Sequence, residues 1–350
     1  MQVNISLTKV VDNSYSITID SLPKIHFDTK VAIVTNPKVA GLHLAYLLSK
    51  ISAKELYIIT VPDGEEYKNQ ESVDLILESL FNHRFNRKSL LIAFGGGVIG
   101  DMTGYVSSIY QRGIDFVQVP TTLLSQVDAS VGGKTGMNNS YGKNLIGAFH
   151  QPQAVYIDPY FLTTLPAREF GAGVAEVVKM AVTFNKEFFE FLESADLNNA
   201  EVLQEALKQA VQTKADVVAQ DEKEHGIRAA LNYGHTFGHV IENETKYKQY
   251  LHGEAVAIGM VMANETSVAM GLMSVDEAQR VKSLLEKYNL PTSYSIADTE
   301  SFYETFFLDK KSSDSAITFI LPVGLGDVKI TDKCEKSLIL SVLTQFGDAR

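Results

Sequence analysis

The sequence predicts an α/β fold in which an N-terminal Rossmann-like domain with a mostly parallel sheet precedes a C-terminal α-helical domain. In the first half, short apolar runs alternate with segments of helical spacing, a pattern typical of a parallel sheet covered on both faces. From about residue 168 to residue 288 the spacing is helical almost throughout. A chain of 350 residues also suits two domains. We expect them at residues 1–165 and 166–350.

The strands of the first half are expected at the apolar runs 31–34, 56–59, 90–94, 116–119 and 154–157. Helices are expected between them at 38–49, 70–82 and 102–112. Residues 3–7 and 15–19 alternate apolar and polar side chains around Asp12-Asn13-Ser14, which predicts a hairpin.

The helices of the second half are expected at 169–183, 187–193, 201–219, 229–245, 254–270 and 274–287. Near the end, residues 316–321 and 328–330 flank a turn rich in glycine, which predicts a short hairpin followed by a closing helix.

Composition excludes several classes of function. A net charge of -11 argues against general binding to nucleic acid or to an acidic membrane surface, since both need a basic field. The single cysteine, Cys334, cannot form an intrachain disulfide and fits a reducing compartment. The N-terminus lacks the basic and apolar regions of a leader, and no apolar run approaches 18 residues. We therefore expect a cytoplasmic protein with no membrane or nucleic-acid partner.

A glycine turn follows the central apolar run. Gly95-x-Gly97-x-x-Gly100 joins a predicted strand to a predicted helix, where free backbone N–H groups and the helix dipole favour a phosphate or pyrophosphate. A tight turn without a ligand is the alternative interpretation. The ordinary dinucleotide fingerprint also needs a carboxylate about 20 residues later, and residues 118–122 hold none. The upstream segment 63–68, Asp-Gly-Glu-Glu-Tyr-Lys, is the candidate ribose partner.

The helical half contains a candidate metal site. His235 and His239 lie one helical turn apart, and His252 follows just before Gly253-Glu254. Glu176 interrupts a very apolar segment, where a carboxylate must be paired, bound to a ligand or facing a cleft. Two histidines and one carboxylate with an open fourth position form a common catalytic zinc set. Histidines that bond backbone carbonyls or lie on the surface are the alternative.

Several basic residues accompany these candidate ligands, and they suggest an anionic substrate that carries both carboxylate and phosphate. They are Lys134, Lys179, Lys214, Arg228, Lys310 and Lys311. Lys134 lies in a polar glycine loop at residues 128–136, which is suited to holding an anion. Each of these residues taken singly could also be a solvated surface charge.

Together these motifs resemble the 3-dehydroquinate synthase family, in the same order along roughly residues 63–311. The matching segments are 94–101, 111–113, 117–124, 127–138, 142–147, 176–179, 232–239 and 252–254. The resemblance implies an enzyme that uses NAD and a divalent metal, zinc or else cobalt. It would convert 3-deoxy-D-arabino-heptulosonate 7-phosphate to 3-dehydroquinate and phosphate. The implied steps are transient oxidation at C5, β-elimination of phosphate, re-reduction, ring opening and intramolecular aldol closure.

The resemblance also implies roles for particular residues. Glu176, His235 and His252 would bind the metal, and His239 would lie beside it. The residues implied in substrate binding and catalysis are Lys134, Asn144, Lys179, Lys214, Arg228, Asn232, His239 and one lysine of the 310–311 pair, taken as Lys310. Arg112 resembles a residue that reaches the phosphate site of a neighbouring subunit, which implies a homodimer.

For NAD, the resemblance implies a pyrophosphate site at the glycine turn and an adenosine side upstream of it. The implied residues are Asp63, Gly64, Glu65, Lys68, Gly96, Gly97, Val98, Ile99, Gly100, Asp101, Thr121, Thr122, Leu124, Asp128, Lys134, Lys143, Phe161 and Thr164. The sequence departs from some relatives at Asn36, where they carry an acidic residue at the end of an early strand. Contacts to the adenine ribose at that position are therefore in doubt.

Three other functions fit parts of the sequence. A different sugar-phosphate cyclase, such as a 2-deoxy-scyllo-inosose synthase or a sedoheptulose 7-phosphate cyclase, would share the cofactor and metal residues, although Lys214 and Arg228 favour a carboxylated substrate. A metal-dependent polyol or alcohol dehydrogenase would release NADH. A non-catalytic nucleotide-binding regulator would keep the glycine turn but would not need the metal residues and basic residues together.

Overall fold

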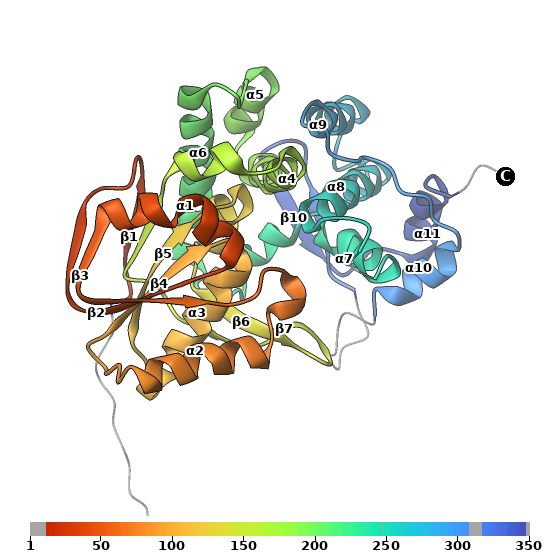
Figure 1. Ribbon diagram of the computed structural model, residues 1–350. Helices are drawn as coiled ribbons and strands as arrows, with labels where there is room; N and C mark the ends of the chain where they lie inside the picture. Colours follow the sequence, from red (N-terminus) through yellow and green to blue (C-terminus); the bar gives the residue numbers. More distant parts are fainter. Residues whose placement is uncertain (1–11, 247, 308–316, 348–350) are drawn as a thin grey trace, which may run out of the picture.

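The computed structural model describes residues 12–246, 248–307 and 317–347. It consists of a sheet covered by helices and a group of helices beside it (Figure 1). Within the described ranges, no helix is both long and apolar enough to cross a membrane.

The main sheet has six parallel strands in the order β1-β8-β5-β4-β2-β3, as the alternation of apolar runs and helices predicted. The strands are β1 (Ser16–Ile19), β2 (Ile25–Thr35), β3 (Ile51–Thr60), β4 (Leu90–Gly95), β5 (Asp115–Pro120) and β8 (Ala154–Ile157). β1 pairs with β8 in parallel. The other arm of the hairpin predicted there, residues 3–7, lies outside the described residues.

Alternate side chains of the central strands enter two separate cores. Val31 and Ile33 of β2 pack toward α1 (Pro37–Lys50), whereas Ala32 and Val34 pack toward α2 (Gln70–Asn82) and α3 (Gly97–Ile109). This two-sided burial follows from the period of two along a strand, and it explains the continuous apolar runs in the sequence. The carboxyl end of β4 is thereby held directly against the start of α3.

Two predicted boundaries near the glycine turn were wrong. The helix expected at 102–112 begins at Gly97 and ends at Ile109, so most of the glycine motif is its first turn. The polar loop expected at 128–136 includes a π-helical turn (Ser125–Ala129) and the start of β6 (Lys134–Asn139). β6 pairs with β7 (Gly142–Phe149) as a hairpin that sequence patterning did not predict. In Figure 1 this hairpin extends from the sheet toward α7.

The second half is helical, as predicted, and its core includes most of the buried side chains of these helices. The helices are α4 (Ala167–Phe184), α5 (Lys186–Ser194), α6 (Ala200–Gln220), α7 (His235–Glu244), α8 (His252–Ala269), α9 (Val275–Lys287), α10 (Thr299–Thr305) and α11 (Lys336–Thr344). β9 (Phe319–Pro322) and β10 (Val328–Thr331) form the predicted antiparallel hairpin.

The helix predicted at 229–245 is divided into a 3-10 segment (Ile227–Asn232) and α7. Gly234 separates the two, with a φ of 81° that disfavours residues carrying a Cβ. The break lets His235 start a new helix, and it therefore sets the direction of the His235 and His239 side chains.

The backbones of α4, α7 and α8 approach one another at glycines. A Cβ on Gly253 would lie 1.9 Å from the carbonyl oxygen of Ala172 in α4. A Cβ on Gly259 would lie 2.0 Å from the carbonyl oxygen of Gly234, at the start of α7. The spacing of these three helices therefore depends on main-chain contact.

We expect Gly259→Ala to lower the free energy of unfolding by about 1–3 kcal/mol, because the added methyl must separate α8 from α7. Gly41→Ala in α1 is the matched control, since a Cβ there meets nothing within 4 Å. That control should be neutral or stabilise the protein by up to about 1 kcal/mol. Denaturant unfolding of both variants measures the difference, and equal effects would contradict the close contact.

Candidate active site

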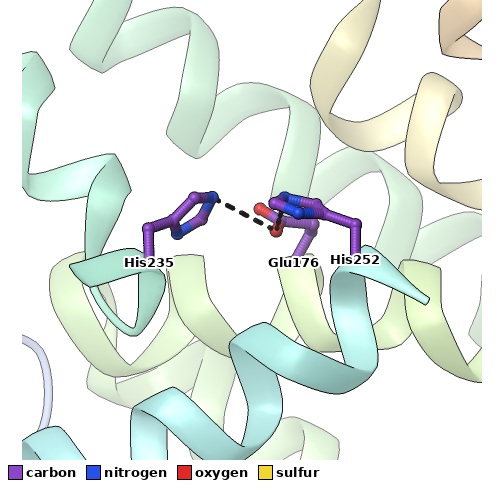
Figure 2. A group of neighbouring side chains, drawn as sticks. All are labelled: Glu176, His235 and His252. Carbon is purple, nitrogen blue, oxygen red and sulfur yellow. Dashed lines mark ion pairs between the residues drawn. The ribbon is translucent and has the colours of Figure 1, made fainter. Parts of the chain in front are cut away.

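Three side chains from three helices converge as predicted from the sequence. Glu176 comes from α4, His235 from the first residue of α7 and His252 from the first residue of α8 (Figure 2). Each Nε2 atom of the two histidines lies 3.9 Å from Oε1 of Glu176. Glu176 Oε2 forms an ion pair with Lys179, whereas the buried Oε1 has no hydrogen-bond partner among the described residues.

The unpartnered oxygen and the two facing nitrogens fit a divalent cation. One ligand atom from each of the three residues lies within 4.8 Å of the others, and only a small contraction would bring them around one ion. A second group that satisfies the same distance test, His239, Glu242 and His252, shares His252 with the first. The ring of His239 lies beside the rings of His235 and His252, with centroids 5.5 Å and 6.2 Å away.

Hydrogen bonds orient both histidine rings. His235 Nδ1 lies 3.2 Å from the carbonyl oxygen of Tyr233, and His252 Nδ1 lies 3.4 Å from each oxygen of Glu242. A ring that donates from Nδ1 presents the lone pair of Nε2 to a cation. Both histidines therefore direct Nε2 toward Glu176.

The two histidines differ in their affinity for protons. Burial, together with the positive charge of Lys179, holds the pKa of His235 well below its ordinary value, so this ring is neutral at pH 7. Burial alone would lower the pKa of His252, but the hydrogen bond and charge of Glu242, with the charge of Glu176, raise it. A cation at Nε2 of His252 would therefore compete with a proton.

The start of α8, which carries His252, is fixed by Glu254. Its carboxylate accepts two hydrogen bonds from Arg168, at 2.6 and 2.7 Å, and one from the backbone N–H of Leu251, at 2.8 Å. Arg168 lies in the first turn of α4, so this contact ties the beginnings of two metal-site helices together.

The glycine turn exposes the start of α3, as the dinucleotide interpretation requires. The N-cap residue is Gly96, and no side chain caps the helix there. Residues Gly97, Val98, Ile99 and Gly100 form the first turn, in which the Ile99 side chain is buried in the core below. A free helix N-terminus of this kind can hold a pyrophosphate.

Asp101 and Lys68 meet beside this helix start. Lys68 Nζ donates to Asp101 Oδ2 and to Asn144 Oδ1, both at 2.5 Å. Burial raises the pKa of the Asp101 carboxyl above its ordinary value, although the ion pair with Lys68 opposes this. Lys68 thus joins the predicted cofactor residue Asp101 to Asn144 on the β6–β7 hairpin.

The predicted adenosine side lies along the strand ends. Asp63 accepts a hydrogen bond of 2.8 Å from Asn36, and Glu65, next to Gly64, accepts one of 2.8 Å from Asn138. Thr164 is hydrogen bonded to His43 at 2.7 Å. Phe161, by contrast, is fully buried in the core beside α1, so only its backbone could face a ligand.

A π-helical turn carries the remaining predicted cofactor residues. It follows Thr121, Thr122 and Leu124, and its i to i+5 bond runs from Ser130 N–H to the Ser125 carbonyl. The turn directs Asp128 toward Lys214 of α6, which donates to Asp128 Oδ1 at 2.8 Å and to its carbonyl oxygen. Burial lowers the pKa of Lys214, while Lys214 and Lys179 hold the pKa of Asp128 below its ordinary value despite burial.

The predicted substrate residues form a connected polar group. Arg228 is 1% exposed and donates through NH2 to the Gly132 carbonyl at 3.0 Å, and its buried Nε has no hydrogen-bond partner among the described residues. Lys134 forms an ion pair with Glu224, whose other oxygen accepts a 2.9 Å hydrogen bond from Asn232. One carboxylate therefore holds two residues that were predicted to bind substrate anions.

Two predicted residues are not part of this group. Arg112 is exposed at the far end of α3, with a φ of 70° and no ion pair or hydrogen bond among the described residues. Lys310 lies outside the described residues.

Sequence reasoning missed two carboxylates in the site, Glu224 and Glu242. Glu224 lies in a run of charged residues at 221–224, which resembles a solvated surface loop. Glu242 lies one helical turn after His239, and this spacing was the available signal.

Comparison with known proteins agrees with this geometry. Residues 58–172 match the family model for the 3-dehydroquinate synthase N-terminal region, and residues 173–312 match the model for its C-terminal region. A 3-dehydroquinate synthase of Sulfurimonas denitrificans is 75% identical over 99% of both chains. One from Helicobacter hepaticus is 58% identical over 96% of both chains.

Solved structures of cyclases share the fold. The 2-epi-5-epi-valiolone synthase ValA of Streptomyces hygroscopicus, with NAD+ and Zn2+ bound, has a TM-score of 0.85 at 26% identity and covers 98% of this chain and 99% of its own. A 2-deoxy-scyllo-inosose synthase with carbaglucose-6-phosphate, NAD+ and Co2+ has a TM-score of 0.80 at 28% identity, covering 91% of each chain. A probable glycerol dehydrogenase of Sinorhizobium meliloti, at 14% identity and a TM-score of 0.61, shares the fold alone.

The fold and the site thus define an enzyme of the sugar-phosphate cyclase class, with a parallel sheet domain and a Glu-His-His cluster in a helical half. Within that class, the chain belongs to the 3-dehydroquinate synthase family.

We expect Glu254→Gln to destabilise the protein at pH 7 by on the order of 1 kcal/mol, because it weakens the charged hydrogen bonds with Arg168. Burial alone would raise the pKa of Glu254, but the bonds from Arg168 and Leu251 lower it below the ordinary 4.5. The stabilisation is therefore complete above pH 4.5 and is lost as the pH falls through the lowered value.

The difference in unfolding free energy between wild type and Glu254→Gln should shrink below about pH 4. Glu78→Gln, at an exposed carboxylate of α2, should show little effect at any pH. A difference for Glu254→Gln that stays constant with pH would show that charge does not contribute.

Proposed function

We propose that this chain is an NAD- and metal-dependent cyclase that converts 3-deoxy-D-arabino-heptulosonate 7-phosphate to 3-dehydroquinate and phosphate. The observation that carries the proposal is the Glu176, His235 and His252 cluster beside a buried arginine and lysines, in a chain 75% identical to a 3-dehydroquinate synthase over nearly its whole length. The reaction transiently oxidises C5, eliminates phosphate, re-reduces C5, opens the ring and closes the carbocycle by an intramolecular aldol step.

The metal would be held by Glu176 Oε1 and by Nε2 of His235 and of His252. The buried unpartnered oxygen and the two nitrogens that face it support this assignment. Zinc and cobalt both suit a set of two imidazoles and one carboxylate. When bound, the metal supplies Lewis acidity toward the substrate hydroxyl, and NAD supplies a reversible hydride acceptor.

The NAD pyrophosphate would lie at the start of α3, against residues 96–101, where free N–H groups meet the positive end of the helix dipole. Asp63, Gly64, Glu65 and Lys68 would line the adenosine side. The predicted residues toward the nicotinamide are Thr121, Thr122, Leu124, Asp128, Lys134, Lys143, Phe161 and Thr164. The short connection from β5 to the π-helical turn brings this second set close to the helical half.

The substrate anions would be held by the basic residues of the polar group. Arg228 has an unpartnered Nε that can donate to the carboxylate, and a planar guanidinium can hold both of its oxygens. Lys134, Asn144, Lys179, Lys214, Asn232 and Lys310 would hold the phosphate and hydroxyl oxygens. His239, beside the metal ligands, would hold a substrate hydroxyl or relay a proton from it.

Arg112 would act in a neighbouring subunit of a homodimer. α3 has 13 residues, which corresponds to a length of about 20 Å, so Arg112 lies far from the cofactor end of its own helix. We further propose that the domains divide at residues 165 and 166 and that the enzyme works in the cytoplasm.

Other sugar-phosphate cyclases remain the main alternative, and the two solved structures above are examples with different named activities. The carboxylate distinguishes the proposed substrate from an uncharged sugar phosphate. A buried arginine with an open donor favours the carboxylated substrate.

The direct test is phosphate release from 3-deoxy-D-arabino-heptulosonate 7-phosphate. We expect release that requires NAD+, stops on chelation and returns with zinc, without net accumulation of NADH. Stoichiometric NADH from a polyol would instead identify a dehydrogenase, and release only from an uncharged sugar phosphate would identify a different cyclase.

We expect Arg228→Lys to lower kcat/KM for the carboxylated substrate by about 10- to 100-fold, because lysine keeps the charge but cannot bind both carboxylate oxygens. Arg280→Lys is the control, since Arg280 pairs with Glu193 between α9 and α5. Inhibition by inorganic phosphate should be unchanged in Arg228→Lys. An equal loss of phosphate binding would mean that Arg228 does not select the carboxylate.

A further inference from the structure

Glu242 lies between the metal cluster and the β6–β7 hairpin, and none of the roles assigned above uses it. It is on α7, and its side chain is 5% exposed. Its two oxygens each lie 3.4 Å from His252 Nδ1, and Oε1 also lies 3.4 Å from Lys143 Nζ on β7. A buried carboxylate in this position joins a metal ligand to a residue of the predicted cofactor site.

The contact with His252 decides which nitrogen of that ring is available. A carboxylate that accepts the Nδ1 proton leaves the Nε2 lone pair directed at Glu176 Oε1, 3.9 Å away. His252 needs this support more than His235 does, because its side chain is 34% exposed and that of His235 is 12% exposed. Without Glu242 the ring would lose its printed partner on the Nδ1 side.

The contact with Lys143 connects distant parts of the chain. Lys143 and Glu242 are 99 residues apart, and the hairpin reaches α7 at this point. Asn144, the next residue on β7, is held by Lys68, which also pairs with Asp101 beside the predicted pyrophosphate site. A chain of contacts therefore runs from the metal ligand through Glu242 to the start of α3.

We propose that Glu242 is a positioning residue that orients His252 for metal binding and couples the metal site to the NAD site through Lys143. This inference rests on the proposed metal site. Carboxylates that accept from the second nitrogen of a metal-bound histidine typically account for about 10- to 100-fold in metal affinity. By linkage, if the contacts through Lys143 couple the two sites, zinc should tighten NAD+ binding and NAD+ should tighten zinc binding by the same factor.

The test is Glu242→Gln in the full chain, which keeps the shape but removes the charge. We expect its zinc dissociation constant, measured by competition with a chromophoric chelator, to rise about 10- to 100-fold. We also expect the factor by which zinc tightens NAD+ binding in the wild type to fall toward one. The visible spectrum of the cobalt-loaded variant should change, which a merely structural effect on folding would not cause.

Glu244→Gln is the matched control. Glu244 is exposed on the same helix, and its carboxylate accepts a hydrogen bond from Tyr294 at 2.7 Å. This variant should keep the zinc affinity, the coupling factor and the cobalt spectrum of the wild type. Lys143→Met should keep zinc affinity within about threefold but lose the coupling, because it removes only the hairpin arm.

His235→Ala separates the two levels of the argument. If it loses zinc while Glu242→Gln binds zinc as tightly as the wild type, the role of Glu242 is refuted and the metal site stands. If His235→Ala itself keeps wild-type zinc affinity, the proposed metal site is wrong and the inference falls with it. A coupling factor unchanged in both Glu242→Gln and Lys143→Met would refute the connection to the NAD site.

Discussion

The buried carboxylate of Glu176 is the constraint on which the helical half depends. An ionised group inside an apolar helix costs several kcal/mol unless opposite charge surrounds it. Lys179, one turn along α4, pairs with one oxygen, and the other oxygen faces two histidines from α7 and α8. Removing any partner would leave a buried charge poorly compensated. The same arrangement that binds a cation therefore also explains why three helices meet at this place.

The sheet domain supplies the complementary half of the site through its strand ends. β4 leads into the free start of α3, and β5 leads into the π-helical turn that carries Asp128. Asp128 then meets Lys214 of the helical half. Chemistry that needs both a hydride acceptor and a Lewis acid requires the two to be adjacent, and these ion pairs across the two halves hold them there.

Local patterns in the sequence were sufficient for the regular parts of the fold. Continuous apolar runs indicated the buried parallel strands, and the spacing of His235, together with a carboxylate in an apolar helix, indicated the metal cluster. The β6–β7 hairpin was missed because its residues, Lys134–Asn139 and Gly142–Phe149, are rich in glycine and asparagine and alternate weakly. The break at Gly234 was missed because helical spacing continues across it. Glu224 and Glu242 take their roles from partners distant along the chain, such as Lys134 and Lys143, which spacing along one helix does not reveal.

The contact of main chain with main chain at Gly253 and Gly259 also affects how this site can change over evolution. Where helices are separated by side chains, each core substitution shifts them slightly, and such shifts accumulate. Here the backbones of α4, α7 and α8 already touch, so they cannot move closer, and larger side chains nearby can rotate a helix more easily than they can alter this spacing. The distances among Glu176, His235 and His252 are thus protected from drift in the surrounding core, and the glycines act as fixed spacers for the ligand set.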